Sequence, residues 1–269
     1  MLRFLSIGSG SSGNCYLLYS ETDAIMIDCG VGTRTLKKHF VSYGLHLSMI
    51  RNILVTHDHA DHVKSVGAFS SSQKIPVYAT RDIFGGIERN WCIKKKVTAE
   101  LAHYIEKGKS YQIGEFQVTP FAVPHDSTDC VGYFIEHGGI RFTLITDCGH
   151  ITDEIASYVN KANYLVIEAN HEPEVLANGP YPQFLKDRIC SQIGHLSNSD
   201  CAKLIAENAT PRLRYVWLCH LSDENNHPEL AKKTIEAELK NYGILVGKDF
   251  QMEVLKRKQP SGFLELTLE

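Results

Sequence analysis

The chain has 269 residues, of which 43% are hydrophobic and 22% charged, and its formal net charge is −3. This length and balance are typical of a globular protein with a sizeable core, and we expect a single domain over residues 1–269. The slightly acidic balance excludes a global basic field, so a nucleic-acid partner would need a local basic patch and metal ions. No apolar run approaches the ~20 residues that span a bilayer, so we expect no membrane partner, and nothing indicates an obligate protein partner.

The eight cysteines are scattered singly, without a CxxC pair, and several lie inside apolar runs. This pattern favours buried thiols in a reducing compartment over a disulfide framework. The N-terminal apolar stretch is interrupted at Gly8, too early for a signal peptide. We therefore expect a cytoplasmic protein.

The first third of the chain combines short apolar runs with helical patterns. Alternating or apolar runs predict strands over 2–7, 15–19, 24–28, 53–56 and 75–79. Helical spacing of apolar residues predicts helices over 33–43, 63–70 and 81–90.

The rest of the chain has a second set of strands with helices between them. Strands are predicted over 111–113, 116–121, 131–136, 140–147, 164–168, 213–220, 250–256 and 262–268. Helices are predicted over 199–208 and 229–241. Two strand sets fit a mixed α/β fold with two sheets covered by helices. They fit a single doubly wound sheet less well.

A dense group of potential metal ligands follows the apolar run 53–55. It comprises His57, His59, Asp61 and His62. On an extended segment His57 and His59 point the same way, whereas the adjacent Asp61 and His62 diverge, which suits a second ion. Imidazole and carboxylate together favour zinc, with manganese or iron also compatible. A polar surface turn rarely has this spacing, so a metal site is the better interpretation.

Acidic or imidazole residues recur where apolar strands stop. They are Asp28, His57, His125, Asp147, Glu168 and His220. One such residue is usually a cap or turn former, but six of them beside a histidine cluster favour a shared site at the strand ends. Asp28 is a candidate to accept the second N–H of a ligating histidine, and its alternative is a turn or helix cap.

Three further segments are candidates for substrate contacts. The loop Gly8–Asn14 can present backbone N–H groups and hydroxyls to an anion, with Ser11 and Asn14 as candidate substrate-binding residues. Its composition alone favours a plain hairpin connection. The basic runs Lys94–Lys96 and Lys256–Lys258 are either solvated faces or the border of a polyanion track.

The motif His57-x-His59-x-Asp61-His62, with the later His125, Asp147 and His220, resembles the metallo-β-lactamase-fold hydrolases over roughly residues 2–225. The resemblance implies an αββα four-layer sandwich with two divalent metal ions at one edge of its sheets. It also implies a ligand assignment: His57, His59 and His125 for one ion; Asp61, His62 and His220 for the other; Asp147 as the bridge.

The segments Glu168–Asn170, His195–Asn198 and His220–Ser222 resemble the nuclease branch of that superfamily. There a Glu and a His form a dyad that handles protons at the leaving group, which implies catalytic roles for Glu168 and His195. The resemblance further implies that Asp61 orients the nucleophilic water and that Ser197 contacts substrate. The loop Gly8–Asn14 and the segment His220–Asn226 resemble the YycJ/WalJ-like exonuclease group, which implies a 5′-to-3′ exonuclease acting on double-stranded DNA.

Other functions stay open from the sequence. A small-molecule hydrolase acting on a cyclic phosphodiester, thioester or lactone has a similar metal site, and a ribonuclease Z-like RNA-processing nuclease shares the dyad. Only twenty residues separate Asp147 from Glu168, which leaves no room for the large inserted domain of some RNA-processing relatives. A purely structural metal module would leave the dyad without a role. His150 and His171 closely follow strand-end carboxylates, and their roles stay open.

Overall fold

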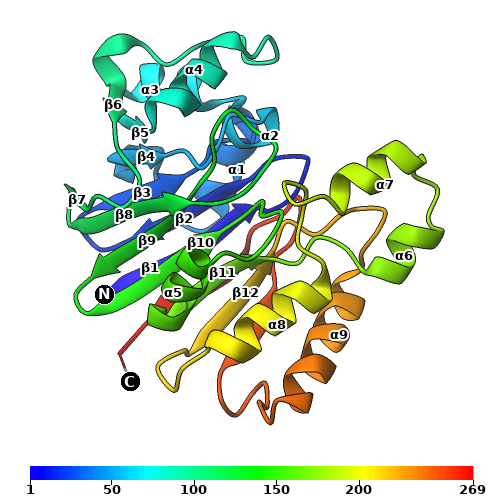
Figure 1. The fold of residues 1–269 in the computed structure, drawn as a ribbon. Helices are drawn as coiled ribbons and strands as arrows, with labels where there is room; N and C mark the ends of the chain where they lie inside the picture. Colours follow the sequence, from blue (N-terminus) through cyan, green and yellow to red (C-terminus); the bar gives the residue numbers. More distant parts are fainter. Residues whose placement is uncertain (269) are drawn as a thin grey trace. The chain divides into compact units, whose positions relative to one another are not determined.

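The computed structural model describes residues 1–268, and in it the chain divides into two compact units. The first comprises Met1–Pro120, Ser127–Val131 and the chain from Lys256 onwards, and the second comprises Phe121–Asp126 and Gly132–Leu255. Each unit has a sheet with helices (Figure 1). The single domain expected from the sequence stays a prediction.

The sheet of the first unit mixes antiparallel and parallel strands in the order β14-β1-β2-β3-β4-β5-β6. Its strands are β1 (Leu2–Gly8), β2 (Cys15–Tyr19), β3 (Ala24–Ile27), β4 (Asn52–Leu54), β5 (Val77–Ala79), β6 (Ala102–Tyr104) and β14 (Ser261–Leu266). The pairs from β14 to β3 are antiparallel, whereas those from β3 to β6 are parallel. Its helices are α1 (Thr33–Ser42), α2 (Ala60–Val63), α3 (Val66–Gln73) and α4 (Arg81–Arg89), with short 3₁₀ turns at Leu47–Met49 and Ala99–Leu101.

The second unit contains five neighbouring strands in the order β13-β12-β11-β10-β9. They are β9 (Val131–His137), β10 (Ile140–Ile145), β11 (Tyr164–Glu168), β12 (Tyr215–Cys219) and β13 (Gln251–Val254). Strands β9 and β10 form an antiparallel hairpin, and β10 to β13 are parallel. Its helices are α5 (Asp153–Lys161), α6 (Pro173–Asn178), α7 (Gln183–Ile189), α8 (Asn198–Asn208) and α9 (Pro228–Asn241). A further hairpin, β7 (Tyr111–Ile113) with β8 (Phe116–Ala122), leads along the chain from the first unit into the second.

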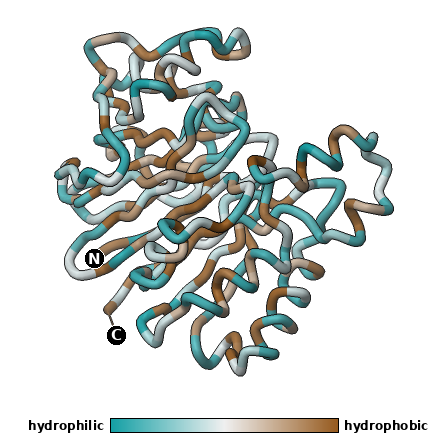
Figure 2. The backbone as a smooth tube through the Cα atoms, viewed as in Figure 1, coloured by the Kyte–Doolittle hydropathy of each residue, from teal (hydrophilic) through white to brown (hydrophobic). Residues whose placement is uncertain are grey.

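Burial follows the sequence periodicity. Every residue of β2 and of β11 is buried, as expected for strands covered on both faces. In α9 the buried residues are Ala231, Ile235 and Leu239, four positions apart, so one stripe of the helix meets the core. Hydrophobic and hydrophilic residues accordingly alternate along this helix (Figure 2), which packs beside α8. None of the helices in residues 1–268 combines the length and apolarity needed to cross a bilayer.

The expected mixed α/β fold with two sheets and helices is confirmed. The sequence missed strand β6 and helices α5, α6 and α7, and the predicted strand 75–79 is regular only over Val77–Ala79. Within each unit, residues that follow parallel strands lie at one edge of the sheet, because the carboxyl ends of parallel strands share that edge. Asp28 follows β3, and His220 follows β12, each directly. Both have positive φ, 60° and 51°, an uncommon conformation for residues other than glycine that is typical of functional sites.

Candidate functional site

In the first unit the histidine cluster spans the turn after β4 and the short helix α2. His57 and His62 are fully buried, and their ring centroids lie 4.0 Å apart. The rings of His57 and His59 are 4.7 Å apart and meet edge to face. Asp61 Oδ2 lies 3.7 Å from His62 Nε2. The four residues that the sequence grouped within one motif therefore also lie close together in space.

A buried carboxylate orients the His62 ring. Asp28 Oδ2 accepts the Nδ1–H of His62 at 2.7 Å, and the carboxylate is itself held by the amide and hydroxyl of Thr56, each at 2.8 Å. Because Nδ1 carries the proton, Nε2 has the lone pair that a metal ion needs. Asp28 thus makes the contact expected of it, whereas Thr56, which supports the carboxylate, has no signal in the sequence.

The loop Gly8–Asn14, the Gly-Ser loop, contacts the same cluster through Asn14. The Asn14 side-chain amide donates to His62 Nε2 at 2.8 Å and to Asp61 Oδ2 at 3.3 Å, and its backbone N–H donates to the Asp61 carbonyl at 2.7 Å. Gly30 lies against that carbonyl, and a Cβ at this position would be 1.5 Å from the Asp61 oxygen. Asn14 therefore touches the candidate ligands themselves. Ser11 is exposed on the loop, and its contact with substrate stays a prediction.

Asp58, inside the motif, is a residue whose role the sequence did not indicate. Its carboxylate accepts from the backbone N–H and the hydroxyl of Thr128, and its carbonyl accepts from the Asn90 side chain at 2.9 Å. The turn between the two histidines is thereby tied to two segments distant in the chain. Such ties hold ligands in place before a metal binds.

In the second unit Glu168 is the centre of a buried cluster. Asp147, Glu168, His195 and His220 each offer a ligand atom within 4.8 Å of the others. Glu168 Oε1 accepts from Nδ1 of His195 at 2.7 Å and from Nδ1 of His220 at 3.0 Å. Its other oxygen accepts the backbone N–H of Cys148 at 2.9 Å and of Leu196 at 3.1 Å. Glu168 and His195 are therefore joined by a short, partly buried hydrogen bond, and their catalytic roles stay a prediction.

Opposite charges set the protonation of this dyad. Burial by itself would raise the pKa of Glu168, but the nearby His195 charge and the hydrogen bonds from the two histidines lower it below the ordinary value. Burial by itself would lower the pKa of His195, but the Glu168 carboxylate, its hydrogen bond and Asp147 raise it. The pair therefore favours an ionised carboxylate beside a protonated imidazole, the state in which a histidine can act as a general acid.

His125 follows β8 and belongs to the same unit. Its Nδ1 lies 3.0 Å from the Gly194 carbonyl oxygen, which can only accept, so Nδ1 carries the proton and Nε2 has the lone pair. Nε2 is 3.8 Å from Asp147 Oδ1. In His220 too, Nδ1 is bound by carboxylate oxygens, Asp147 Oδ1 being 3.0 Å away.

These donor sets fit divalent metal ions. His62, His125 and His220 each have Nδ1 held by an oxygen, which presents Nε2 as the ligand atom, the arrangement found around metal-binding histidines. Buried carboxylate and imidazole donors within ligand distance of one another are typical of zinc, manganese and iron sites. Each unit therefore carries its own group of candidate ligands.

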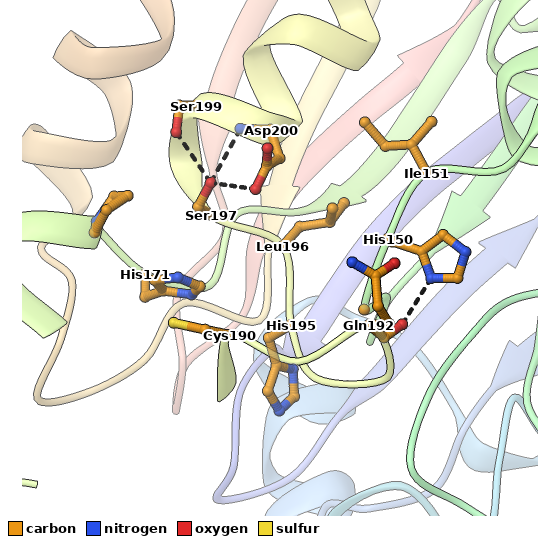
Figure 3. Close-up of a pocket in the computed structure, with 12 residues that line it drawn as sticks. His150, Ile151, His171, Cys190, Gln192, His195, Leu196, Ser197, Ser199 and Asp200 are labelled. Atoms are coloured by element: carbon orange, nitrogen blue, oxygen red, sulfur yellow. Dashed lines mark hydrogen bonds between the residues drawn. The ribbon is translucent and has the colours of Figure 1, made fainter. Parts of the chain in front are cut away.

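A cavity of about 380 Å³ opens beside the dyad in the second unit. His195 forms part of its wall, together with Cys190, Gln192 and the start of α8 (Figure 3). Ser197 caps α8, since its hydroxyl oxygen accepts the Asp200 N–H at 3.1 Å, and its own proton goes to the Asp200 carboxylate at 2.6 Å. A substrate contact by Ser197 stays a prediction. His150 and His171 also line the cavity, which the sequence could not indicate.

Comparison with known proteins places this geometry in a family. The family model described as beta-lactamase superfamily domain matches residues 23–220. A relative from Bacillus anthracis named exodeoxyribonuclease YycJ is 30% identical over 97% of each chain. A relative from Streptococcus pneumoniae named exodeoxyribonuclease WalJ is 32% identical over 93% of each chain.

Solved structures agree on the fold. Zn²⁺-bound PqqB from Methylobacterium extorquens superposes with a TM-score of 0.73 at 15% identity, covering 98% of this chain and all of its own. The metallo-beta-lactamase fold protein YhfI from Bacillus subtilis gives a TM-score of 0.71 at 15% identity, covering 97% of this chain and 99% of its own. At such identity the likeness concerns the fold alone. Taken with the family model and the two exodeoxyribonuclease relatives, it shows that the chain is a metal-dependent hydrolase belonging to the metallo-β-lactamase superfamily.

Proposed function

We propose that the protein is a 5′-to-3′ exonuclease that hydrolyses phosphodiester bonds of double-stranded DNA with divalent metal ions. The observation that carries the proposal is the 2.7 Å hydrogen bond between His195 and the buried Glu168 carboxylate, beside candidate metal ligands. A phosphodiester releases an alkoxide, which needs a proton, whereas a thiolate leaves with less proton assistance. The names of the YycJ and WalJ relatives support DNA as the substrate.

Two metal ions per chain, most simply zinc with manganese or iron as alternatives, complete the proposal. The ligands that we propose are those implied by the sequence resemblance: His57, His59 and His125 for one ion; Asp61, His62 and His220 for the other; and Asp147 for both. When bound, such ions supply Lewis-acid stabilisation to the oxygens of the phosphate ester.

The chain's own residues provide proton transfer and orientation. Glu168 holds the proton on Nδ1 of His195 and fixes the ring, so that Nε2 of the protonated ring donates to the leaving 3′ oxygen. Asp61, held by Asn14, orients the attacking water by accepting a hydrogen bond from it. Asp28 keeps His62 in the tautomer whose Nε2 is available as a ligand.

A cationic cavity in the first unit supports the proposal that the substrate is a polyanion. Lys64, Arg257 and Lys258 line a cavity of about 290 Å³ together with Ser12 and Thr35. Helix α1 begins at the same place, and its N-cap Gly32 provides no side-chain acceptor, so the first backbone N–H groups add positive potential. The Gly-Ser loop and the C-terminal basic run, two candidates from the sequence, thus line one cavity suited to a phosphate.

The salt dependence of DNA binding tests this cavity. Replacing Lys64, Arg257 and Lys258 by Gln removes three positive charges, which lowers the slope of log K against log salt by about 0.9 for each phosphate that the protein no longer neutralises. Lys233→Gln on α9 removes an exposed lysine in the other unit and serves as the matched control. An unchanged slope in the triple variant would remove this support for a DNA substrate.

The proposed activity is tested with a substrate panel in the presence of Mn²⁺ or Zn²⁺. The panel contains duplex DNA, single-stranded DNA, RNA, a cyclic phosphodiester, a thioester and a lactone. We expect duplex DNA to be the preferred substrate and its cleavage to be abolished by Asp61→Ala and strongly reduced by His195→Ala. Cleavage that survives Asp61→Ala unchanged contradicts the proposal.

A second candidate function is hydrolysis of a small phosphodiester. The cavity beside His195 favours it, because about 380 Å³ lies within the range that small-molecule sites occupy. The substrate panel separates the two, since a small-molecule hydrolase would prefer the cyclic phosphodiester to duplex DNA.

A further inference from the structure

The chain has two tryptophans in opposite environments. Trp217 is completely buried in β12, whereas Trp91, just after α4, exposes 90% of its surface. Tryptophan buries more apolar area than almost any other residue when it folds into a core. An indole left in water in this way is typical of a contact surface for another molecule.

The indole belongs to a well-anchored loop, which we define as residues 90–96. The Asn90 side chain accepts the Cys92 N–H at 3.0 Å, so a hydrogen bond spans Trp91. After it, Ile93 is 2% exposed and anchors the loop in the core, and Lys96 Nζ donates to the Ile87 and Asn90 carbonyls at 2.6 and 2.7 Å. Trp91 is therefore presented to solvent by a loop that is fixed at both ends.

The same loop is bonded to the metal-ligand turn. Asn90 Nδ2 donates to the carbonyl of Asp58 at 2.9 Å, and Asp58 lies between His57 and His59 in the chain. The indole is thus one residue from a side chain that holds the candidate ligands in place. This connection sets Trp91 apart from other exposed aromatic residues such as Phe184, which lies on α7 in the second unit.

The charge of the segment fits a polyanion. The 90–96 loop contains three lysines and no carboxylate, in a chain whose net charge is −3. Lys94 and Lys95 are exposed, while the Lys96 ammonium donates to the Ile87 and Asn90 carbonyls. An exposed indole beside exposed lysines is the combination with which proteins hold unpaired nucleotides, the ring stacking on a base and the ammonium groups meeting phosphates.

We propose that the 90–96 loop is a base-stacking platform for the unpaired end of a DNA substrate. Trp91 stacks on a nucleobase of the frayed or single-stranded terminus, and Lys94 and Lys95 bind the phosphates next to it. The inference rests on the proposed nuclease function and adds to it the residues that recognise a DNA end. Stacking is tolerant of sequence, so the platform predicts preference for an unpaired end and none for a particular base.

Tryptophan fluorescence tests the platform directly, because Trp217 is buried and Trp91 is accessible. The metal-loaded protein is titrated with a phosphorothioate duplex, which resists hydrolysis, carrying either a short single-stranded tail or blunt ends. We expect the tailed duplex to quench the fluorescence more strongly and to bind about 5- to 150-fold more weakly to Trp91→Ala, the range for loss of one stacked base. Trp91→Phe keeps an aromatic face and stays close to wild type, and Phe184→Ala, the matched control, leaves binding unchanged.

Two outcomes overturn the platform: Trp91→Ala binding the tailed duplex like wild type, or Trp91 fluorescence that depends on protein concentration and ignores DNA, which would indicate contact with a second copy. Hydrolysis of bis(p-nitrophenyl) phosphate separates this inference from the proposed function. That small ester does not reach beyond the reacting phosphate, so Trp91→Ala hydrolyses it at the wild-type rate. If the wild-type protein cleaves DNA and the ester, and Trp91→Ala leaves binding of the tailed duplex unchanged, the platform alone is refuted. If the protein binds the tailed duplex through Trp91 but cleaves neither DNA nor the ester, the nuclease function alone is refuted.

Discussion

Glu168 Oε1 lies 2.7 Å from His195 Nδ1, and the carboxylate is completely buried. A buried carboxylate of this kind is stable only with several donors, and Glu168 has four: two imidazole rings and the backbone N–H groups of Cys148 and Leu196. Of the His195 and His220 rings, only that of His195 lines the neighbouring cavity, where a leaving group can reach it. The relationship between these two residues is the basis of the proposed proton transfer.

The dyad predicts a dependence on the leaving group. We expect His195→Gln to lower kcat on DNA by roughly 10²- to 10⁴-fold, the usual contribution of a general acid, because an alkoxide must be protonated as it leaves. On bis(p-nitrophenyl) phosphate the same variant should lose less than about tenfold, since nitrophenolate departs without a proton. His171→Gln, in the same cavity but outside the dyad, is the control. Equal losses on both substrates would show that His195 acts in some other way.

Asp28 predicts the strength of metal binding. In Asp28→Asn an amide faces His62 Nδ1, so the ring is no longer held in the tautomer that leaves Nε2 as a ligand. We expect metal affinity, measured by calorimetric titration, to fall about 10- to 100-fold. Asp23→Asn changes another buried aspartate that contacts neither the histidines nor Thr56, and should keep wild-type affinity. If both variants bind metal equally well, Asp28 has no role in orienting the ligand.

The space around Gly30 and Gly32 predicts different effects of an alanine substitution at the two positions. A methyl group at Gly30 would lie 1.5 Å from the Asp61 carbonyl oxygen, so Gly30→Ala must displace the backbone of a candidate ligand. We expect a loss of at least ~1–3 kcal/mol in the free energy of unfolding, as in overpacked cores, together with weaker metal binding. Gly32→Ala meets no atom within 4 Å and should change the unfolding midpoint only slightly. Denaturant unfolding of both variants checks the prediction, and similar stabilities would contradict it.

Tyr215 predicts how stability changes at alkaline pH. Burial, and then the charge of Glu253 and its hydrogen bond with the tyrosine hydroxyl, raise the pKa of Tyr215 to about 12. The unfolded chain releases this proton near pH 10, so the contribution to stability is complete below about pH 10 and is lost as the pH rises towards 12. In Tyr215→Phe this loss should be absent, and one late tyrosinate transition should disappear from the ultraviolet titration. A variant with the wild-type titration curve would assign that transition to another tyrosine.

The sequence indicated which candidate site residues lie close together better than it predicted the elements around them, for physical reasons. The metal-ligand motif is local, and polar residues that end apolar strands are visible without a structure, as Asp28 and Glu168 demonstrate. Helices α6 and α7 were missed because Gly179, Pro180 and Pro182 interrupt the segment between them and their own patterns are short.

Hydrogen bonds between distant segments could not be predicted. The roles of Thr56, Asp58 and Asn90 depend on hydrogen bonds to residues 28 to 70 positions away, which no local pattern encodes. The sequence treated the run Lys94–Lys96 as a unit. The structure separates the exposed Lys94 and Lys95 from Lys96, which donates to the Ile87 and Asn90 carbonyls, and shows that Trp91 is exposed.

The most direct test of the account compares two duplex DNAs of the same sequence in the presence of Mn²⁺, one linear with a 5′ label and one covalently closed. An exonuclease needs an end, so we predict that the linear duplex is shortened from its 5′ ends to mononucleotides while the closed circle stays intact. Asp61→Ala should abolish the release of labelled mononucleotide. Cleavage of the closed circle, or an intact linear duplex under conditions in which the protein has bound its metal, would contradict the central claim.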